Sequence, residues 1–211
     1  EPFNEPNTNY WGANGGQEGC HFSAETQSNL LRVLAPKLKT SGLKAKISAC
    51  DETNVTTAIS EFQYYQKEGD IIPLLGQLNV HTYGGNPKDK SNLKDLVNEL
   101  GLPFWMSETG SGGTGIAGNL GLAQRMFEDL NNLNPIAWID WQFVEEGNDQ
   151  WCFVKGNFSQ QTYTVVKNYY IRMQVTRFIK KGYTFLATGR NDLLAAISPD
   201  NSELVIVMLN S

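Results

Sequence analysis

The chain has 211 residues, a formal net charge of -5, and 18% charged residues spread along its length. It therefore lacks the basic patch that nucleic-acid binding requires, and no run of about 18 apolar residues is present to span a membrane. The three cysteines and two histidines are scattered rather than grouped as the four closely spaced ligands of a structural zinc site. We expect no metal, no cofactor, and no nucleic-acid or membrane partner.

Short apolar runs alternate with helical patterns over most of the chain, which favours βα units around a parallel sheet. Five strands are expected, each followed by a helix, near residues 2–5, 46–50, 78–83, 103–107 and 136–143. A closed (β/α)8 TIM barrel needs eight such units. The chain therefore resembles units four to eight of a barrel, within the α/β class.

The helices are expected near residues 24–41, 55–65, 92–100, 120–133 and 164–179. Asn54 is a candidate N-cap for the second helix. Pro36 predicts a kink or an early end of the first helix, because proline lacks the N–H that the helix needs. The sequence Gly84-Gly85-Asn86-Pro87 predicts a turn, and residues 144–162 predict a long loop.

The pattern of the sequence changes after Gly182, from alternating strands and helices to short β runs. Three short β runs, near residues 183–186, 193–197 and 204–209, are separated by turn sequences rich in Gly, Asn, Asp and Pro. This spacing is typical of antiparallel hairpins. We therefore divide the chain into residues 1–181, part of a barrel, and residues 182–211, part of an all-β domain.

Glutamates end two of the expected strands. Glu5 lies in Asn4-Glu5-Pro6, and Glu108 lies in Ser107-Glu108-Thr109-Gly110. Active sites of TIM barrels lie at the C-terminal ends of the strands. Cleavage of a glycosidic bond needs one carboxyl group to protonate the leaving oxygen and a second to attack or stabilise the anomeric carbon. We therefore expect Glu5 to be the acid/base and Glu108 the nucleophile of a retaining glycoside hydrolase.

Further polar residues are candidates for the same pocket. Asn4 is placed to bond the substrate 2-hydroxyl beside the reacting carbon, and His81 is expected to hold a pocket residue rather than act as a general base. Glu18 either contacts the substrate or faces solvent. A subsite or capping role is favoured over catalysis for Asp51 and Glu52, which lie at another strand end.

Trp138 and Trp141 are three residues apart on one expected strand, so their side chains point to opposite faces. One of them can then line the pocket while the other packs beneath helices. We expect Trp141 to be the one in the pocket.

These motifs together resemble glycoside hydrolase family 30, a (β/α)8 family of retaining glycosidases. The similar segments are Asn4-Glu5, Glu108, Val80-His81-Thr82-Tyr83, residues 137–141 and residues 167–182. The resemblance implies the catalytic roles of Glu5 and Glu108, a hydrogen bond from Tyr83 to the nucleophile, and an aromatic sugar platform within residues 137–141. Residues 1–6 and 17–20 look most like the endo-β-1,6-galactanase branch.

The resemblance also implies how the chain is used. It indicates a polysaccharide or oligosaccharide substrate, a secreted or periplasmic location, and an upstream segment of the same protein that supplies the first three barrel units. We therefore expect an endo-β-1,6-galactanase that works by double displacement. The alternatives are a β-1,6-glucanase or xylanase of the same family, or a non-catalytic carbohydrate-binding fragment.

Overall fold

The structure is a computed structural model, and it describes residues 1–17, 19–110 and 112–210. These residues form two compact units. The N-terminal unit contains residues 1–107 and Pro135–Ala137, and the C-terminal unit contains Glu108–Asn134 and the chain from Trp138 onward. The chain therefore enters the C-terminal unit at Glu108, returns to the N-terminal unit at Pro135 and enters the C-terminal unit again at Trp138.

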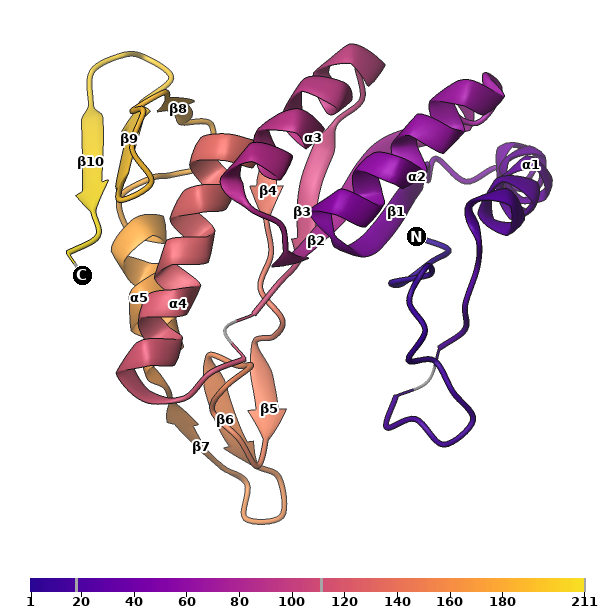
Figure 1. Cartoon of the computed structure of the whole chain (residues 1–211). Helices are drawn as coiled ribbons and strands as arrows, with labels where there is room; N and C mark the ends of the chain where they lie inside the picture. The colour runs from indigo at the N-terminus through magenta and orange to yellow at the C-terminus, as the bar shows by residue number, and fades with distance from the viewer. Residues whose placement is uncertain (18, 111, 211) are drawn as a thin grey trace. The chain divides into compact units, whose positions relative to one another are not determined.

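A four-stranded sheet forms the centre of the N-terminal unit (Figure 1). Its elements, in chain order, are α1 (Ala24–Thr40), β1 (Ile47–Asn54), α2 (Val55–Glu68), the short 3-10 helix η1 (Ile72–Leu74), β2 (Leu75–Gly84), α3 (Pro87–Leu100), β3 (Phe104–Glu108) and β4 (Ala137–Trp138). The strand order is β1-β2-β3-β4. The strands β1 and β2 pair in parallel, with Cys50 opposite Asn79. This parallel sheet confirms the α/β prediction.

Side-chain caps determine where the helices of this unit begin. Ser23, Asn54 and Asn86 each accept a hydrogen bond from the backbone N–H three residues later, which satisfies a donor that a helix start leaves unpaired. The predicted cap at Asn54 is confirmed. Pro87 occupies the first turn of α3, where its missing N–H carries no penalty. The expected turn at residues 84–87 therefore begins a helix, and α1 continues past Pro36 to Thr40.

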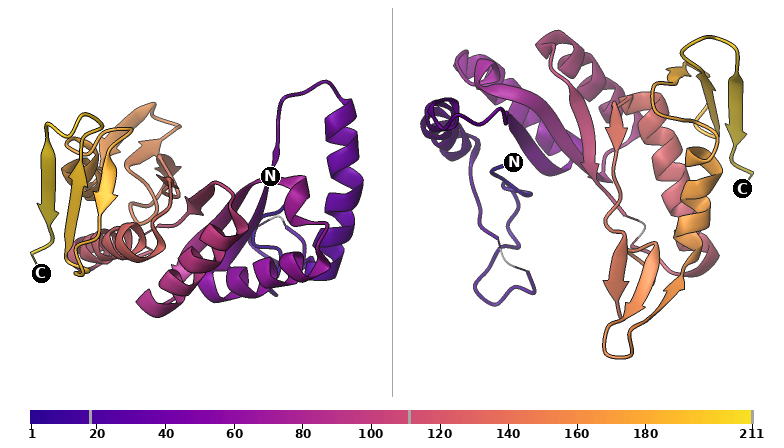
Figure 2. Two further views of the ribbon diagram at one scale, coloured as in Figure 1. Left: turned by 90° about the horizontal axis from the view of Figure 1, so that it is seen from above. Right: turned by 180° about the vertical axis from the view of Figure 1, so that it is seen from behind.

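The core of the N-terminal unit lies between the sheet and the helices beside it. Helix α2 packs against β1 and β2 and lies next to α3 (Figure 2). Phe62 and Tyr65 of α2, Leu93 of α3 and Leu78 of β2 are all fully buried. Each large apolar side chain contributes about 1.5–3 kcal/mol when buried. This packing fixes the strands whose C-terminal ends carry the polar residues discussed below.

Helices and two small sheets build the part of the C-terminal unit that the structure describes. Its elements are α4 (Gly115–Glu128), the π-helical turn η2 (Asp129–Leu133), β5 (Val144–Glu146), β6 (Val154–Asn157), β7 (Thr162–Val165), α5 (Lys167–Thr176), β8 (Thr184–Leu186), β9 (Leu193–Ile197) and β10 (Leu204–Met208). Helix α4 packs against α5. The sheets have the orders β5-β6-β7 and β10-β9-β8. The predicted antiparallel strands near the C-terminus are confirmed, and the domain boundary at residue 182 stays a prediction.

Some expected strands and helices differ in the structure. Residues 2–5 form no strand, so that prediction was wrong. The Glu5 N–H donates to the Asp51 carbonyl oxygen at 2.8 Å, but Pro2 and Pro6 have no N–H with which to extend a ladder. Strand β4 contains only Ala137 and Trp138 of the expected residues 136–143.

The expected loop at residues 144–162 contains β5, β6 and the first residue of β7. Strand β7 also includes residues that were expected to begin the last helix, which starts only at Lys167. Strands of three or four residues have too few alternating positions to be recognised by pattern. Pairing with neighbouring strands decides their conformation instead.

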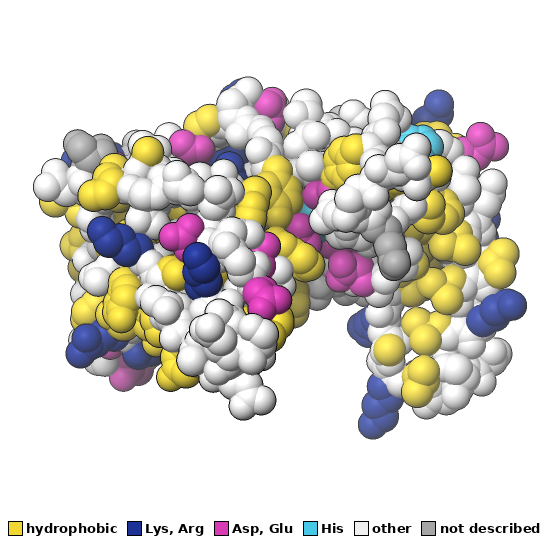
Figure 3. Space-filling view, turned by 90° about the horizontal axis from the view of Figure 1, so that it is seen from below, with side chains coloured by type: hydrophobic (Ala, Val, Ile, Leu, Met, Phe, Trp, Pro, Cys, Tyr) yellow, Lys and Arg dark blue, Asp and Glu magenta, His cyan; other side chains and the backbone are white. Residues whose placement is uncertain are grey.

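Several large hydrophobic side chains remain at the surface of the C-terminal unit, among them Phe143, Phe158 and Tyr163. Figure 3 shows hydrophobic side chains reaching the surface among charged and polar ones on the face that it draws. Among the described residues, no helix has both the length and the apolar character to cross a membrane.

Candidate active site

Glu5 is buried, and hydrogen bonds hold its backbone in place. Its N–H donates to the Asp51 carbonyl oxygen, and its own carbonyl oxygen accepts from the Thr8 hydroxyl at 2.8 Å and the Trp11 indole N–H at 2.9 Å. The residue has a φ of 47°, in the left-handed region. Such a conformation costs on the order of 1–3 kcal/mol and persists where the surrounding contacts enforce it. These contacts therefore fix the direction of the Glu5 side chain.

His81 of β2 contacts the Glu5 carboxyl group. Its Nδ1 lies 2.9 Å from Glu5 Oε1, and its Nε2 lies 3.9 Å from Asp51 Oδ1. The imidazole is almost fully buried between the two acids. With Glu5 ionised, the Nδ1–H donates to it, which orients the carboxylate. The expectation that His81 holds a pocket residue has a structural basis in this contact, and its role in binding substrate stays a prediction.

Asp51, on the other side of the His81 ring, accepts hydrogen bonds from two side chains. Ser107 Oγ donates to its Oδ1 at 2.6 Å, and Asn79 Nδ2 donates to its Oδ2 at 3.2 Å. Burial raises the pKa of Asp51 to about 7, with a further contribution from Glu1, against the lowering effect of these hydrogen bonds. Asp51 is therefore a buried partner of the site rather than a helix cap.

Asn79 and Ser107 were not predicted from the sequence as residues of the site. A signal was present, because Asn79, His81 and Tyr83 alternate along β2, and alternate residues of a strand share a face.

A second pair of buried acids lies deeper in the N-terminal unit. Burial raises the pKa of Glu52 on β1 to about 7, partly offset by the Asn7 backbone and the Gln27 side chain. Burial also raises the pKa of Glu61 on α2 to about 7, and the neighbouring Glu52 adds to this shift. Both side chains are nearly inaccessible to solvent. These two carboxyl groups therefore bind protons near neutral pH.

Glu108 is the last residue of β3, as predicted, and the backbone that follows it is tightly held within the C-terminal unit. The Thr109 N–H donates to the Ile139 carbonyl oxygen at 3.2 Å, and the Trp141 N–H donates to the Thr109 carbonyl oxygen at 2.6 Å. Arg125 of α4 donates from Nη1 to Thr109 Oγ1 at 3.1 Å and to the Gly110 carbonyl oxygen.

The Trp151 ring covers Gly110. A Cβ atom at Gly110 would lie 2.6 Å from Trp151 Cε3 and 2.8 Å from the Trp141 carbonyl oxygen, so only glycine fits there. Arg125 and Trp151 were not singled out from the sequence, since nothing in their spacing connects them to Glu108.

The two tryptophans of the expected eighth strand occupy different environments. Trp138 is buried, its indole N–H donates to Asp129 Oδ2 at 2.8 Å, and the Arg172 guanidinium carbon lies 4.5 Å from its ring centroid. Trp141 is 44% exposed. Trp141 lies beyond β4, so the prediction that the two side chains point to opposite faces of one strand was wrong. The sugar contact of Trp141 stays a prediction.

The other residues expected to bind substrate are placed as follows. Tyr83 is half-buried, with its ring centroid 6.1 Å from that of His81 in an edge-to-face arrangement. Asn4 is exposed. Glu18 lies outside the described residues. Their contacts with a sugar stay predictions.

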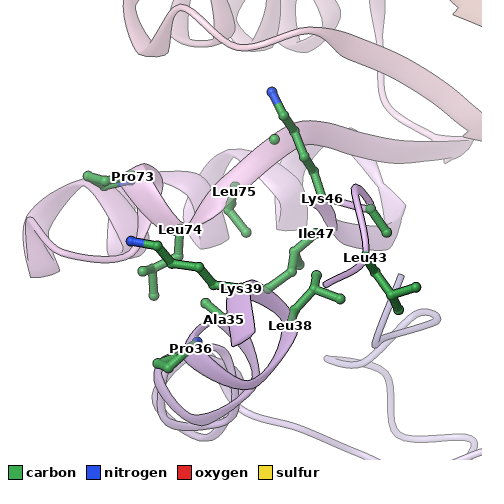
Figure 4. A pocket seen from close by; sticks show the side chains of 12 residues that line it. Ala35, Pro36, Leu38, Lys39, Leu43, Lys46, Ile47, Pro73, Leu74 and Leu75 are labelled. Carbon is green, nitrogen blue, oxygen red and sulfur yellow. The ribbon is translucent and has the colours of Figure 1, made fainter. Parts of the chain in front are cut away.

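A separate apolar cavity of about 720 Å³ lies at the opposite end of the strands. Figure 4 shows Leu38 of α1, Ile47 at the start of β1 and Leu75 at the start of β2 pointing into it. Residues at this end of a parallel sheet serve stability, whereas ligands bind at the carboxyl ends of the strands. The cavity is therefore not the site of chemistry.

Comparisons with known proteins agree with the family resemblance. No family model matches the chain. It is 30% identical over 211 residues to an endo-β-1,6-galactanase of Hypocrea rufa, covering all of this chain and 43% of that protein. It is 26% identical over 194 residues to an exo-β-1,6-galactobiohydrolase of Bifidobacterium longum subsp. longum, covering 69% of this chain and 12% of that protein.

The fold is also found among solved structures. The catalytic domain of the GH30 xylanase C from Talaromyces cellulolyticus superposes with a TM-score of 0.73 at 17% identity, covering 96% of this chain and 47% of that chain. The chain thus spans less than half the length of the curated relatives that it matches. It is a homologue of an endo-β-1,6-galactanase, and it has the fold of glycoside hydrolase family 30 catalytic domains.

Proposed function

We propose that this chain is part of a retaining glycoside hydrolase that cleaves β-1,6-linked galactan within the polymer. Homology to an endo-β-1,6-galactanase along the whole chain supports the substrate class. The observation that carries the assignment is Glu5, a buried carboxyl group with an enforced left-handed backbone and a hydrogen bond to a buried histidine. A solvated loop glutamate would need none of these contacts.

Glu5 and Glu108 divide the chemistry in this proposal. Protonated Glu5 gives its proton to the glycosidic oxygen while the Glu108 carboxylate attacks the anomeric carbon, so the bond to the leaving sugar breaks as the glycosyl–enzyme ester forms. Glu5 then removes a proton from water, which attacks the same carbon and releases Glu108. This double displacement requires the two carboxyl groups to lie about 5–5.5 Å apart in the working enzyme.

The neighbouring residues orient these groups and the sugar. His81 holds the Glu5 carboxylate through Nδ1, and Asp51 supports the other side of the ring. Asn4 bonds the 2-hydroxyl, Tyr83 bonds the nucleophile, and the exposed Trp141 ring provides a sugar platform.

We extend the proposal to the whole protein. The chain supplies units four to eight of a (β/α)8 barrel over residues 1–181 and part of a β-domain over residues 182–211, and an upstream segment of the same protein supplies the remaining units. A polymer substrate that cannot enter cells favours secretion or a periplasmic location. The relatives' greater length supports the larger assembly.

The test is hydrolysis by the whole protein. β-1,6-Galactan, β-1,6-glucan and glucuronoxylan are offered separately, and oligosaccharides are expected from galactan. NMR of the first product should show the β-anomer. Glu108→Ala should abolish turnover, with azide restoring part of it on an activated aryl galactoside, whereas Glu25→Ala, at an exposed acid of α1, should leave it unchanged.

Other outcomes would replace the proposal. Release of sugars only from xylan would reject the galactan assignment, and an α-anomeric first product would reject the retaining mechanism. Binding of galactan without any hydrolysis would favour the non-catalytic alternative.

A further inference from the structure

The β5-β6-β7 sheet of the C-terminal unit carries an open groove of about 540 Å³. Three aromatic rings line it: Phe143 before β5, Phe158 after β6 and Tyr163 on β7. They are 64%, 62% and 74% exposed, respectively. Large apolar rings gathered in one exposed place mark interaction sites more often than chance exposure does. The volume lies within the range of about 300–1,000 Å³ that is typical of small-molecule sites.

The sheet is built so that these rings stay accessible. Tyr163 pairs with Gly156 across β6 and β7, and Gly156 has no side chain to cover it. A Cβ atom at Gly156 would lie 2.7 Å from Phe158 Cε1, so the glycine also makes room for the Phe158 ring. The Glu146 carboxylate accepts the Phe158 N–H at 2.9 Å, which holds the start of the turn that carries this ring.

The chemistry of the lining selects a neutral ligand with both polar and apolar faces. No side chain that lines the groove is an acid or a base, apart from the Tyr163 phenol. Asn157, Gln161 and Thr162 supply amide and hydroxyl groups beside the rings. A galactopyranose ring has this dual character, because its C–H groups form a contiguous patch on one face while hydroxyl groups surround the edge. Aromatic side chains with polar neighbours match such a ligand.

We propose that this groove binds neutral β-linked galacto-oligosaccharide, as a polymer-binding subsite carried by the loop that follows β4. The ligand class rests on the proposed function, whereas the groove itself does not. The rings of Phe158 and Tyr163 stack on sugar faces, and the Asn157 and Gln161 amides bond to hydroxyl groups. The groove increases the affinity for the polymer and takes no part in breaking the glycosidic bond.

The experiment is affinity electrophoresis of the whole protein in gels containing soluble β-1,6-galactan. The wild type should be retarded, and Phe158→Ala combined with Tyr163→Ala should weaken binding about tenfold or more, since loss of one stacking contact is worth about 1 kcal/mol. The ring-keeping variant Tyr163→Phe should bind like the wild type. Tyr170→Ala, which removes a half-exposed ring of α5 outside the groove, serves as the matched control.

Hydrolysis of a short aryl galactoside, measured in parallel, separates this proposal from the proposed function. If the double variant is retarded less than the wild type but hydrolyses the aryl galactoside equally well, the groove is supported as a binding site. If neither protein hydrolyses the substrate and the double variant alone loses retardation, the groove is supported and the proposed function is not. Equal retardation of the double variant and the wild type, or no retardation of the wild type, overturns it. So does a double variant that differs from the wild type only in self-association, measured by light scattering, since the rings would then bind a second copy.

Discussion

Glu5 and Asp51 both have φ values in the left-handed region, 47° and 57°, and both contact His81. Each such conformation costs on the order of 1–3 kcal/mol and persists where the surrounding contacts enforce it. The His81 imidazole lies between the two acids, with Nδ1 2.9 Å from Glu5 Oε1 and Nε2 3.9 Å from Asp51 Oδ1.

Replacement of His81 by alanine is expected to lower kcat about 100-fold with a smaller change in KM. The Glu5 carboxylate would lose its Nδ1 partner and its fixed direction, and misplacement of a reacting group by about 1 Å has an effect of this size. The pH profile of kcat should also change, because the hydrogen bond between His81 Nδ1 and the Glu5 carboxyl group is lost. His21→Ala, at the exposed second histidine, is the control. An unchanged kcat and pH profile in His81→Ala would contradict this role.

The buried carboxyl groups of Asp51, Glu52 and Glu61 make stability depend on pH. Each has its pKa raised to about 7 in the folded chain, mainly by burial. The unfolded chain loses these protons near pH 4, so between about pH 4 and 7 the folded state binds more protons and stability falls as the pH rises. Each group is expected to account for a loss on the order of a few kcal/mol.

Urea denaturation at pH 5 and pH 8 tests this expectation. The wild type should be more stable at pH 5, and Glu61→Gln should reduce the difference because glutamine keeps the shape without the charge. Glu25→Gln, at an exposed acid, should leave the difference unchanged. Higher stability at pH 8 would show that these carboxyl groups are ionised and paired with other groups in the folded chain, and not protonated.

At the scale of elements, the ends of strands position the candidate site. Strand β2 supplies Asn79, His81 and Tyr83 from alternate positions, and β1 supplies Asp51 beside it. Strand β3 ends at Glu108, and Arg125 of α4 donates to the Thr109 hydroxyl and to the Gly110 carbonyl oxygen. A strand and the helix that follows it thus hold the nucleophile in the proposed mechanism.

Gly110→Ala should lower both stability and activity. The added Cβ meets the Trp141 carbonyl oxygen at 2.8 Å as well as the Trp151 ring, so backbone next to Glu108 must move. Overpacking of this kind costs about 1–3 kcal/mol. Gly121→Ala is the matched control, because a Cβ there meets nothing within 4 Å and alanine favours the interior of α4. Thermal midpoints and kcat are the measurements, and equal behaviour of the two variants would contradict the argument.

At the scale of the whole molecule, the sheet of the N-terminal unit ends at β4, which is only two residues long. Ile136, immediately before β4, donates its N–H to the Phe104 carbonyl oxygen and leaves its side chain 71% exposed. An apolar residue at a sheet edge invites pairing with another chain. In the proposed complete barrel, a further strand covers this edge.

Residues 1–211 expressed by themselves are therefore expected to associate in solution. Ile136→Lys should reduce the association, since a charge at an edge opposes pairing. Ile116→Lys, at a similarly exposed position on α4, should not. Light scattering gives the mass. A stable and active monomer of the unchanged chain would mean that its edge needs no further strand.

Local signals in the sequence determined much of this protein. The cap at Asn54, the end of β3 at Glu108, the parallel sheet and the antiparallel strands near the C-terminus follow from residues close together in the chain. The carboxylates proposed for catalysis were also recognisable, because Asn4-Glu5-Pro6 and a second glutamate at the end of β3 form local patterns.

Tertiary structure alone decided which distant residues meet. Strands β5 to β7 exist only through pairing with one another. Asp51 is buried with Asn79 and Ser107, and Ser107 is 56 positions away from it. Gly110 likewise contacts Arg125 and Trp151, which are far from it in the sequence. Such contacts arise from packing in three dimensions, which spacing along the chain does not encode.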